Sequence, residues 1–493
     1  MVKKLIVGVA SGYLLKLVQV VCNLALIPFL ISDGIFGLAG YGGLSVVLAT
    51  IGLMAAGYDG WRLSTARRLG IAEKTGEAAY LPLLIITISS VLLLCMGAHL
   101  YGSQIIKLIG ISSPSIHLAL YMTIYFLFEQ INFLSEQCFH AKGKTWIVNL
   151  LILLEVVCRT ITIFWLFNII NPSIELYLKV FIIYMIAKYM VYLVLFFLNK
   201  NNGSTPFVLT RIREELDTFL YSLPLSLKGL SVFAVFRLTV IVVNKYLAPE
   251  LAAIYSILMV TLRGYVLQLF FSVVRPMIVP VTAGIEISKL SKSSRLQLQS
   301  LLKGYEFVVC TTCLVMACLV PVWLSHWLDK DMSHYHLLFI AGIAFFGLEV
   351  SSSVKNLLLV SQGYGKTLTS FTVIMSVSFL IYLGLITVNF ETLTMELIMI
   401  GVIVFIVLYA GVSVPYLFSN RILKDKNRSF LALPATYVFI VLSSLVTIEW
   451  LRYKDLPEVL IVIYGLLFLM IYLLFIYNPF TDYYFHKKRV INR

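Results

Sequence analysis

The sequence predicts an all-α integral membrane protein with about 14 transmembrane helices, arranged as two six-helix lobes of a parallel repeat plus two C-terminal helices. Three observations support this fold class. Hydrophobic residues make up 60% of the chain and charged residues only 13%, the mean hydropathy is +0.94, and apolar runs recur from end to end. A run of about 20 apolar residues crosses a hydrocarbon core as a helix. This composition excludes an ordinary soluble protein.

The apolar runs divide the chain into fourteen expected spans separated by short polar loops. We expect residues 1–200 to form the N-terminal lobe, 201–420 the C-terminal lobe, and 421–493 two extra helices and a basic cytoplasmic tail. The approximate spans are 5–31, 35–57, 80–101, 115–138, 146–168, 176–198, 218–243, 251–274, 306–325, 337–360, 368–388, 394–418, 431–450 and 458–477.

Positive charge distinguishes the two sides of the expected membrane. The loops on the side of the termini carry 25 Lys and Arg residues and the opposite loops carry 5, which leaves eight of the 38 inside the spans. Because positively charged loops remain in the cytoplasm, we predict that both termini are cytoplasmic. The net charge of +14 is therefore a signal of topology, and no nucleic-acid partner is expected from it.

Two sequence echoes predict that the lobes are parallel repeats. Leu38–Tyr41 (LAGY) returns 213 residues later at Leu251–Tyr255 (LAAIY), and both open an apolar run. His140–Thr145 returns 222 residues later at Gln362–Thr367, and both end in Gly-Lys-Thr. Two echoes in the same order and at similar offsets indicate internal repetition.

The first 70 residues contain three features that suggest a family. Pro28 lies late in the first span, a turn leads into Gly37–Tyr41, and a basic loop with Arg62, Arg67 and Arg68 follows the second span. This layout resembles the polysaccharide and O-antigen flippases of the multidrug/oligosaccharidyl-lipid/polysaccharide exporter (MOP) superfamily. The resemblance implies alternating-access transport of undecaprenyl-pyrophosphate-linked oligosaccharides across the bacterial inner membrane.

Cations inside the expected spans are candidates for substrate binding. A charge in mid-membrane costs at least ~2.5 kcal/mol, so it should face protein or a water-filled cavity. Lys and Arg bind phosphate oxygens, and an excess of them suits an anionic passenger. The candidates are Lys16, Lys188, Lys228 and Arg263 near mid-membrane, and Arg237, where relatives of the flippase family often carry an acid.

Polar residues at helical spacing accompany these cations. Lys16, Gln19 and Asn23 share one face of the first span, Glu129 and Asn132 share a face of the fourth, and Glu349, Ser352 and Asn356 share a face of the tenth. The amides and hydroxyls could bind sugar hydroxyls, and Glu129 and Glu349 are candidates for ion coupling. A contact between helices is the alternative for any single stripe, and an internal ion pair is expected for Glu155 and Arg159.

The remaining motifs predict no cofactor and no catalysis. Neither Gly-Lys-Thr has the upstream glycine of a P-loop, since Cys138 and Val360 occupy those positions, so no ATP is expected. Cys310 and Cys313 lack a second ligand pair, so no metal is expected. Expected partners are the lipid-linked oligosaccharide, membrane lipids and polysaccharide polymerase machinery. The alternatives are a multidrug or other amphiphile exporter, a membrane-embedded polysaccharide polymerase, and a structural scaffold.

Overall fold

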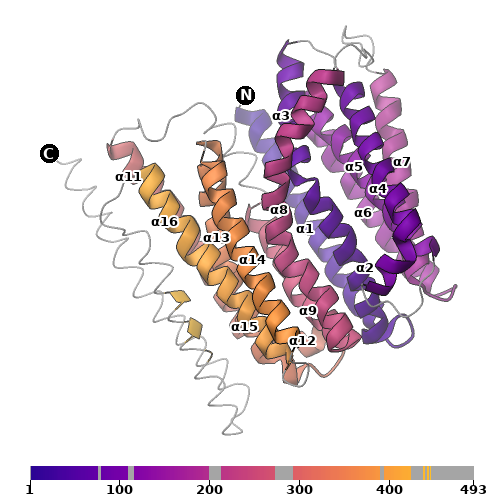
Figure 1. Ribbon diagram of the computed structural model, residues 1–493, viewed down its shortest axis with the longest axis vertical. Helices are drawn as coiled ribbons and strands as arrows, with labels where there is room; N and C mark the ends of the chain where they lie inside the picture. Colours follow the sequence, from indigo (N-terminus) through magenta and orange to yellow (C-terminus); the bar gives the residue numbers. More distant parts are fainter. Residues whose placement is uncertain are drawn as a thin grey trace. The chain divides into compact units, whose positions relative to one another are not determined.

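The computed structural model describes residues 2–75, 79–108, 116–198, 212–271, 292–362, 364–388, 393–423 and five residues between 437 and 445. In these ranges all regular structure is helical (Figure 1), which confirms the predicted fold class. The chain forms two compact units, unit 1 over Met1–Ile257 and unit 2 over Leu258–Arg493. The division into lobes at residue 200 stays a prediction.

Each of the first twelve expected spans overlaps a described helix. Eleven of them are long and apolar enough to cross a membrane, and the apolar segment Tyr80–Leu94 is shorter. The largest difference concerns the ninth span, which was expected at 306–325 and lies at Leu298–Cys318. The thirteenth span has only five described residues and the fourteenth lies outside the described residues. The chain is therefore a multi-pass membrane protein.

Unit 1 is a bundle of consecutive helices. α5 packs against α4, α3 and α7, α1 packs against α6, and α2 packs against α8. The helices are α1 (Val2–Ile31), α2 (Gly37–Gly57), α3 (Asp59–Thr75), α4 (Tyr80–Leu108), α5 (Ile116–Ala141), α6 (Thr145–Phe167), α7 (Ile174–Leu198), α8 (Ile212–Tyr246) and α9 (Pro249–Tyr255).

Glycine permits the tight connection between α5 and α6. Gly143 has a φ of 69°, which side-chain-bearing residues rarely adopt. Its N–H donates to the carbonyl of His140 at 3.0 Å, and the N–H of Lys144 donates to the carbonyl of Phe139 at 2.9 Å. This is the Schellman arrangement that ends a helix. The Gly-Lys-Thr motif at this position therefore ends one helix and starts the next.

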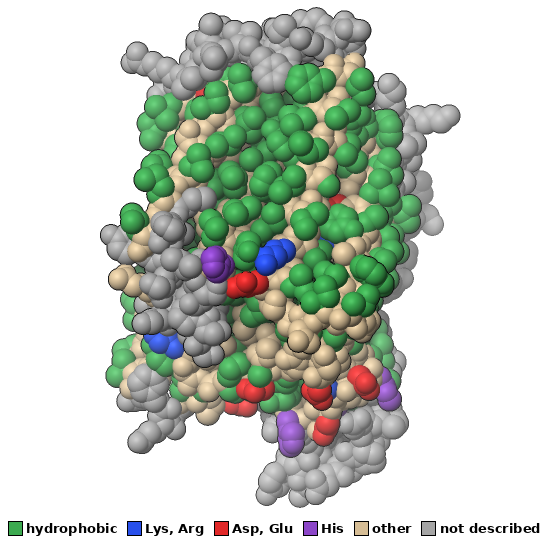
Figure 2. Space-filling view, turned by 90° about the vertical axis from the view of Figure 1, so that its right-hand side faces the viewer, with side chains coloured by type: hydrophobic (Ala, Val, Ile, Leu, Met, Phe, Trp, Pro, Cys, Tyr) green, Lys and Arg blue, Asp and Glu red, His purple; other side chains and the backbone are tan. Residues whose placement is uncertain are grey.

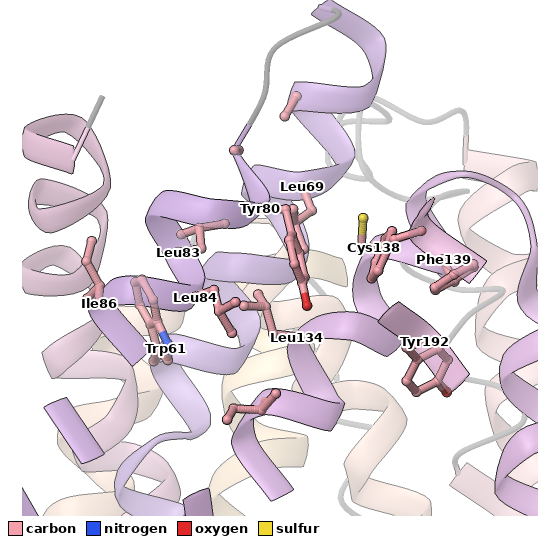
Figure 3. Packing of buried hydrophobic residues seen from close by; sticks show 14 of the residues in the cluster. Trp61, Leu69, Tyr80, Leu83, Leu84, Ile86, Leu134, Cys138, Phe139 and Tyr192 are labelled. Atoms are coloured by element: carbon pink, nitrogen blue, oxygen red, sulfur yellow. The ribbon is translucent and has the colours of Figure 1, made fainter. Parts of the chain in front are cut away.

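An apolar core packs α3, α4, α5 and α7 of unit 1 together. Figure 3 shows Trp61, Tyr80, Cys138, Phe139 and Tyr192 in this core. The indole N–H of Trp61 is satisfied inside it, since it donates to the Thr87 hydroxyl at 3.0 Å. Such packing fixes the facing sides of α5 and α7, where the charged residues described below are found.

Unit 2 is built around α13. Of the 18-residue apolar stretch of this span, 83% is buried, against 22% of the corresponding stretch in α14. α11, α15 and α16 pack against α13, and the Tyr437 hydroxyl donates to its Ala344 carbonyl. The elements are α11 (Lys292–Cys318), α12 (Val320–Leu328), η4 (Ser333–Tyr335), α13 (His336–Ser361), α14 (Gly365–Val388), α15 (Met395–Ile406), η6 (Val407–Ser413), α16 (Val414–Phe418) and η7 (Ser419–Leu423).

The outer surface of the helices is apolar. Figure 2 shows a face on which hydrophobic side chains form a broad continuous area, with acidic side chains gathered towards its lower end. Leu93, Met96, Ile161, Trp165 and Met190 are each exposed by more than half. A surface of this kind is stable in contact with lipid rather than water.

Candidate functional site

The largest group of charges in the described helices lies between α5, α6 and α7 of unit 1. The Lys188 ammonium is 3.1 Å from Glu136 Oε1 and 2.6 Å from Glu155 Oε2. Arg159 Nη1 is 2.7 Å from Glu155 Oε1, and its guanidinium lies 3.9 Å from the centre of the Phe181 ring. The ion pair expected between Glu155 and Arg159 is confirmed, and it is part of a larger network.

Lys16 on α1 extends this network. Its ammonium donates to Gln19 Oε1 at 3.1 Å and lies within electrostatic range of Glu136. Lys16, Gln19 and Asn23 are all half-buried, and the structure thus brings the first two into contact as one polar stripe. We call Lys16, Glu136, Glu155, Arg159 and Lys188 the unit 1 charge cluster.

The unit 1 charge cluster contains more positive than negative groups. Its three cations and two carboxylates leave a net charge of +1 when all are ionised. Burying charge in a membrane protein is costly unless it is paired or faces water. A surplus cation among buried groups is therefore suited to an anionic ligand.

Glu129 on α5 is held by an arginine that was expected in a cytoplasmic loop. Arg62 Nη2 is 2.7 Å from Glu129 Oε1, and Arg62 Nε donates to Gln130 Oε1 at 3.0 Å. Arg62 lies in helix α3, so its assignment to a loop was wrong. Arg68 of the same helix pairs with the buried Glu215 at 2.7 Å. The contacts of Arg62 with Glu129 and Gln130 join the first turn of α3 to α5.

The Asn132 side chain is hydrogen-bonded to the backbone of two helices. Its amide donates to the Met185 carbonyl of α7 at 2.9 Å and to the Phe128 carbonyl of its own helix at 2.9 Å. It is buried. Asn132 therefore joins α5 to α7 next to the unit 1 charge cluster.

The two cations of α8 lie beside α2 and α3. Arg237 Nη1 donates to the Leu48 carbonyl at 2.9 Å, and a Cβ at Gly52 would overlap the Arg237 guanidinium. Lys228 lies within electrostatic range of Asp59. Arg237 is thus packed against backbone where α8 crosses α2.

Charged side chains in unit 2 form separate pairs. Arg263 Nε donates to Glu349 Oε2 at 2.6 Å and its Nη2 donates to Glu349 Oε1, a bidentate pair. Lys355 Nζ donates to Glu306 Oε2 at 2.8 Å, and both side chains are only 1% exposed. Sequence reasoning missed Glu306 because it was placed at the edge of the ninth span. Its position inside the apolar window Leu298–Cys318 is the signal that could have identified it.

Polar contacts of α13 in unit 2 lie close to π-helical turns. Asn356 donates to the Tyr409 hydroxyl at 2.8 Å, and Tyr409 lies in the π-helical segment η6. Arg263 follows directly after another such segment, η2 (Ser256–Leu262). The Ser352 hydroxyl donates to the Glu349 carbonyl at 2.9 Å within α13. π-Helical turns are rare and occur frequently at functional sites.

The predicted cations thus have different partners in the structure. Lys16 and Lys188 lie in the unit 1 charge cluster, Arg263 is bound by Glu349, and Arg237 is bound to backbone. Lys188 and Arg263 have no acid nearby in the sequence, and their partners come from other helices. Ion coupling by Glu129 and Glu349 stays a prediction. Each of these carboxylates is bound by an arginine, with which a proton would have to compete. No group of three or more potential metal ligands occurs among the described residues.

No family model and no curated protein matches the sequence, but solved structures of transporters share its fold. The lipid II flippase MurJ in an inward closed conformation matches with a TM-score of 0.63 and 13% identity, over 97% of this chain and 100% of that one. An inward-facing multidrug resistance MATE family transporter of the MOP superfamily matches with a TM-score of 0.60 and 15% identity, over 85% of this chain and 96% of that one. The MATE multidrug transporter DinF-BH has a TM-score of 0.58, 15% identity, and coverage of 87% and 97%. The structural neighbours of this chain are thus MOP-superfamily transporters, and it has their fold.

Proposed function

We propose that the protein is a flippase that moves undecaprenyl-pyrophosphate-linked oligosaccharide repeat units across the bacterial inner membrane by alternating access. The repeat units would belong to an O-antigen, a capsule or an exopolysaccharide. The observation that carries the proposal is the net positive unit 1 charge cluster, in which three cations on α1, α6 and α7 accompany two carboxylates.

The chemistry of the passenger explains why buried cations are useful. A pyrophosphate has to cross a region of low dielectric constant, where an uncompensated anion is strongly disfavoured. Ammonium and guanidinium groups compensate that charge and donate hydrogen bonds to phosphate oxygens. The amides of Gln19 and Asn23, on the same stripe as Lys16, are suitable donors and acceptors for sugar hydroxyls.

The extent of the structural match favours a lipid-linked passenger over a drug. The lipid II flippase matches 97% of the chain, whereas the two MATE structures match 85% and 87%. A multidrug exporter nevertheless shares the fold, so the test has to separate the two passengers.

Deletion of the gene in its host should leave lipid-linked repeat units on the inner leaflet and remove surface polysaccharide. The repeat units are measured by mass spectrometry of extracted lipids, and their leaflet by access of a glycan-binding lectin in sealed vesicles. Susceptibility to cationic dyes should not change. Absence of the repeat units would mean a role in their synthesis, and unpolymerised units on the outer leaflet would mean a polymerase. Increased dye susceptibility with normal polysaccharide would mean drug export.

A further inference from the structure

The two carboxylates of the unit 1 charge cluster are held to different degrees. Both oxygens of Glu155 have a cation, with Arg159 at 2.7 Å from Oε1 and Lys188 at 2.6 Å from Oε2. Glu136 has a single ion pair among the described residues, the longer 3.1 Å contact with Lys188. Its side chain is 17% exposed, whereas that of Glu155 is 8% exposed. Glu136 is therefore the carboxylate that can leave the cluster at lower cost.

Lys16 has unused hydrogen-bonding capacity. Its ammonium carries three donors, and among the described residues it has one hydrogen bond, to the neutral amide oxygen of Gln19. The acid in its electrostatic range is Glu136. A ligand anion placed at Lys16 and Lys188 would thus compete with Glu136 for the Lys188 ammonium and use the free donors of Lys16.

A buried hydroxyl next to the cluster has no partner in this arrangement. Tyr192 follows Lys188 by one turn of α7, is 0% exposed, and its hydroxyl has no hydrogen bond among the described residues. It lies within electrostatic range of Glu136 and Glu155. A buried donor without an acceptor is costly. A carboxylate that changes its position in this region would supply the missing acceptor.

We infer that the unit 1 charge cluster is the pyrophosphate-binding site and that Glu136 is a built-in counter-anion, which the pyrophosphate displaces from Lys188. The inference rests on the proposed function. With Glu136 displaced, Lys16, Lys188 and Arg159 oppose Glu155 alone and the net charge is +2. A lipid-linked pyrophosphate has one ionised oxygen on each phosphorus, so the charges of site and ligand balance.

A built-in anion solves two physical problems of such a carrier. In the empty protein, Glu136 reduces the cost of holding three cations inside the membrane. In the loaded protein, its competition weakens binding, so the passenger can leave on the far side. Removal of Glu136 should accordingly tighten binding and slow transport, whereas removal of a cation should weaken binding.

The test uses the full-length protein in lipid nanodiscs and inorganic pyrophosphate as the probe, with affinity measured by calorimetry at one pH and ionic strength. Glu136→Gln should bind pyrophosphate roughly tenfold more tightly than the wild type, and Lys16→Gln roughly tenfold more weakly. Glu175→Gln, the same change at the start of α7, should leave affinity unchanged. The double variant Glu136→Gln with Lys188→Gln restores the net charge and should lose the gain, and thermal unfolding of each variant shows that it is folded.

Unchanged or weaker binding by folded Glu136→Gln would overturn the counter-anion role. An equal gain in Glu175→Gln would overturn it as well, because the effect would then come from net charge alone. If Lys16→Gln binds like the wild type and the double variant keeps the gain of Glu136→Gln, the cluster is not the binding site. The deletion experiment on lipid-linked repeat units is independent of these affinities, so the proposed function can fail or hold separately.

Discussion

The unit 1 charge cluster and the ion pairs described in unit 2 hold buried charge in different ways. In unit 1, Lys188 is shared by Glu136 and Glu155, and Glu155 is shared by Lys188 and Arg159. In the described part of unit 2, Arg263 pairs with Glu349 and Lys355 with Glu306, and the two pairs share no residue. The first arrangement is connected and carries surplus positive charge, and the second consists of neutral pairs.

This difference separates charges suited to binding from charges suited to structure. In a neutral, fully buried pair such as Lys355–Glu306, the cation can bind an anion only if the contact between the two helices is broken. A connected cluster can exchange one partner while the others keep their contacts. The comparison therefore predicts that the two unit 2 pairs govern stability and that the cations of the unit 1 charge cluster govern transport.

The largest effect is expected for Lys355. Lys355→Met leaves the Glu306 carboxylate buried without its cation, which should cost about 3–5 kcal/mol of stability. The loss is measured as a lower thermal unfolding midpoint in detergent and as reduced abundance in the membrane. The matched control is Lys355→Met with Glu306→Leu, which should regain most of the stability because an apolar pair replaces the ionic one. A single variant as stable as the wild type would contradict the structural role.

A smaller effect, on transport alone, is expected for Lys16. Lys16→Ala removes a charge-assisted bond worth roughly 1.5–3 kcal/mol, or about ten- to a hundredfold in substrate binding, at near-normal abundance. Lys16→Arg should be tolerated better than Lys16→Gln because the charge is kept. The measurement is complementation of surface polysaccharide, normalised to membrane-inserted protein.

The same assay on the other predicted cations sharpens the contrast. Lys188→Ala and Arg263→Ala should reduce abundance as well as activity, because each leaves a buried carboxylate short of a partner. Full activity at normal abundance in the alanine variants of Lys16, Lys188, Lys228 and Arg263 would exclude the basic-site mechanism.

The smallest effect is expected where Arg237 packs against α2. Gly52→Ala places a methyl group on the guanidinium, and such overpacking costs typically about 1–3 kcal/mol. Gly57→Ala near the end of the same helix has open space at its Cβ and is the control, with little change expected. Equal unfolding midpoints for the two variants would show that Arg237 moves aside without cost.

Much of the membrane architecture could be predicted from the sequence because it depends on local composition. The first twelve spans follow from runs of apolar residues, and those runs coincide with the described helices. The Glu155–Arg159 pair was also predictable, since residues four apart on a helix face the same side. Lys16 with Gln19 follows from the same periodicity, three apart on α1.

The pairing of charges between helices was decided only by the tertiary structure. Lys188 and Glu136 are 52 residues apart, Arg62 and Glu129 are 67 apart, and Arg263 and Glu349 are 86 apart. Apolar periodicity fixes that a helix spans the membrane, but it does not fix which neighbour the helix packs against or its rotation. The predicted cations, which looked unpaired along the chain, therefore fall in the folded protein into one connected cluster with Lys188, one ion pair of Arg263 with Glu349, and a backbone contact of Arg237.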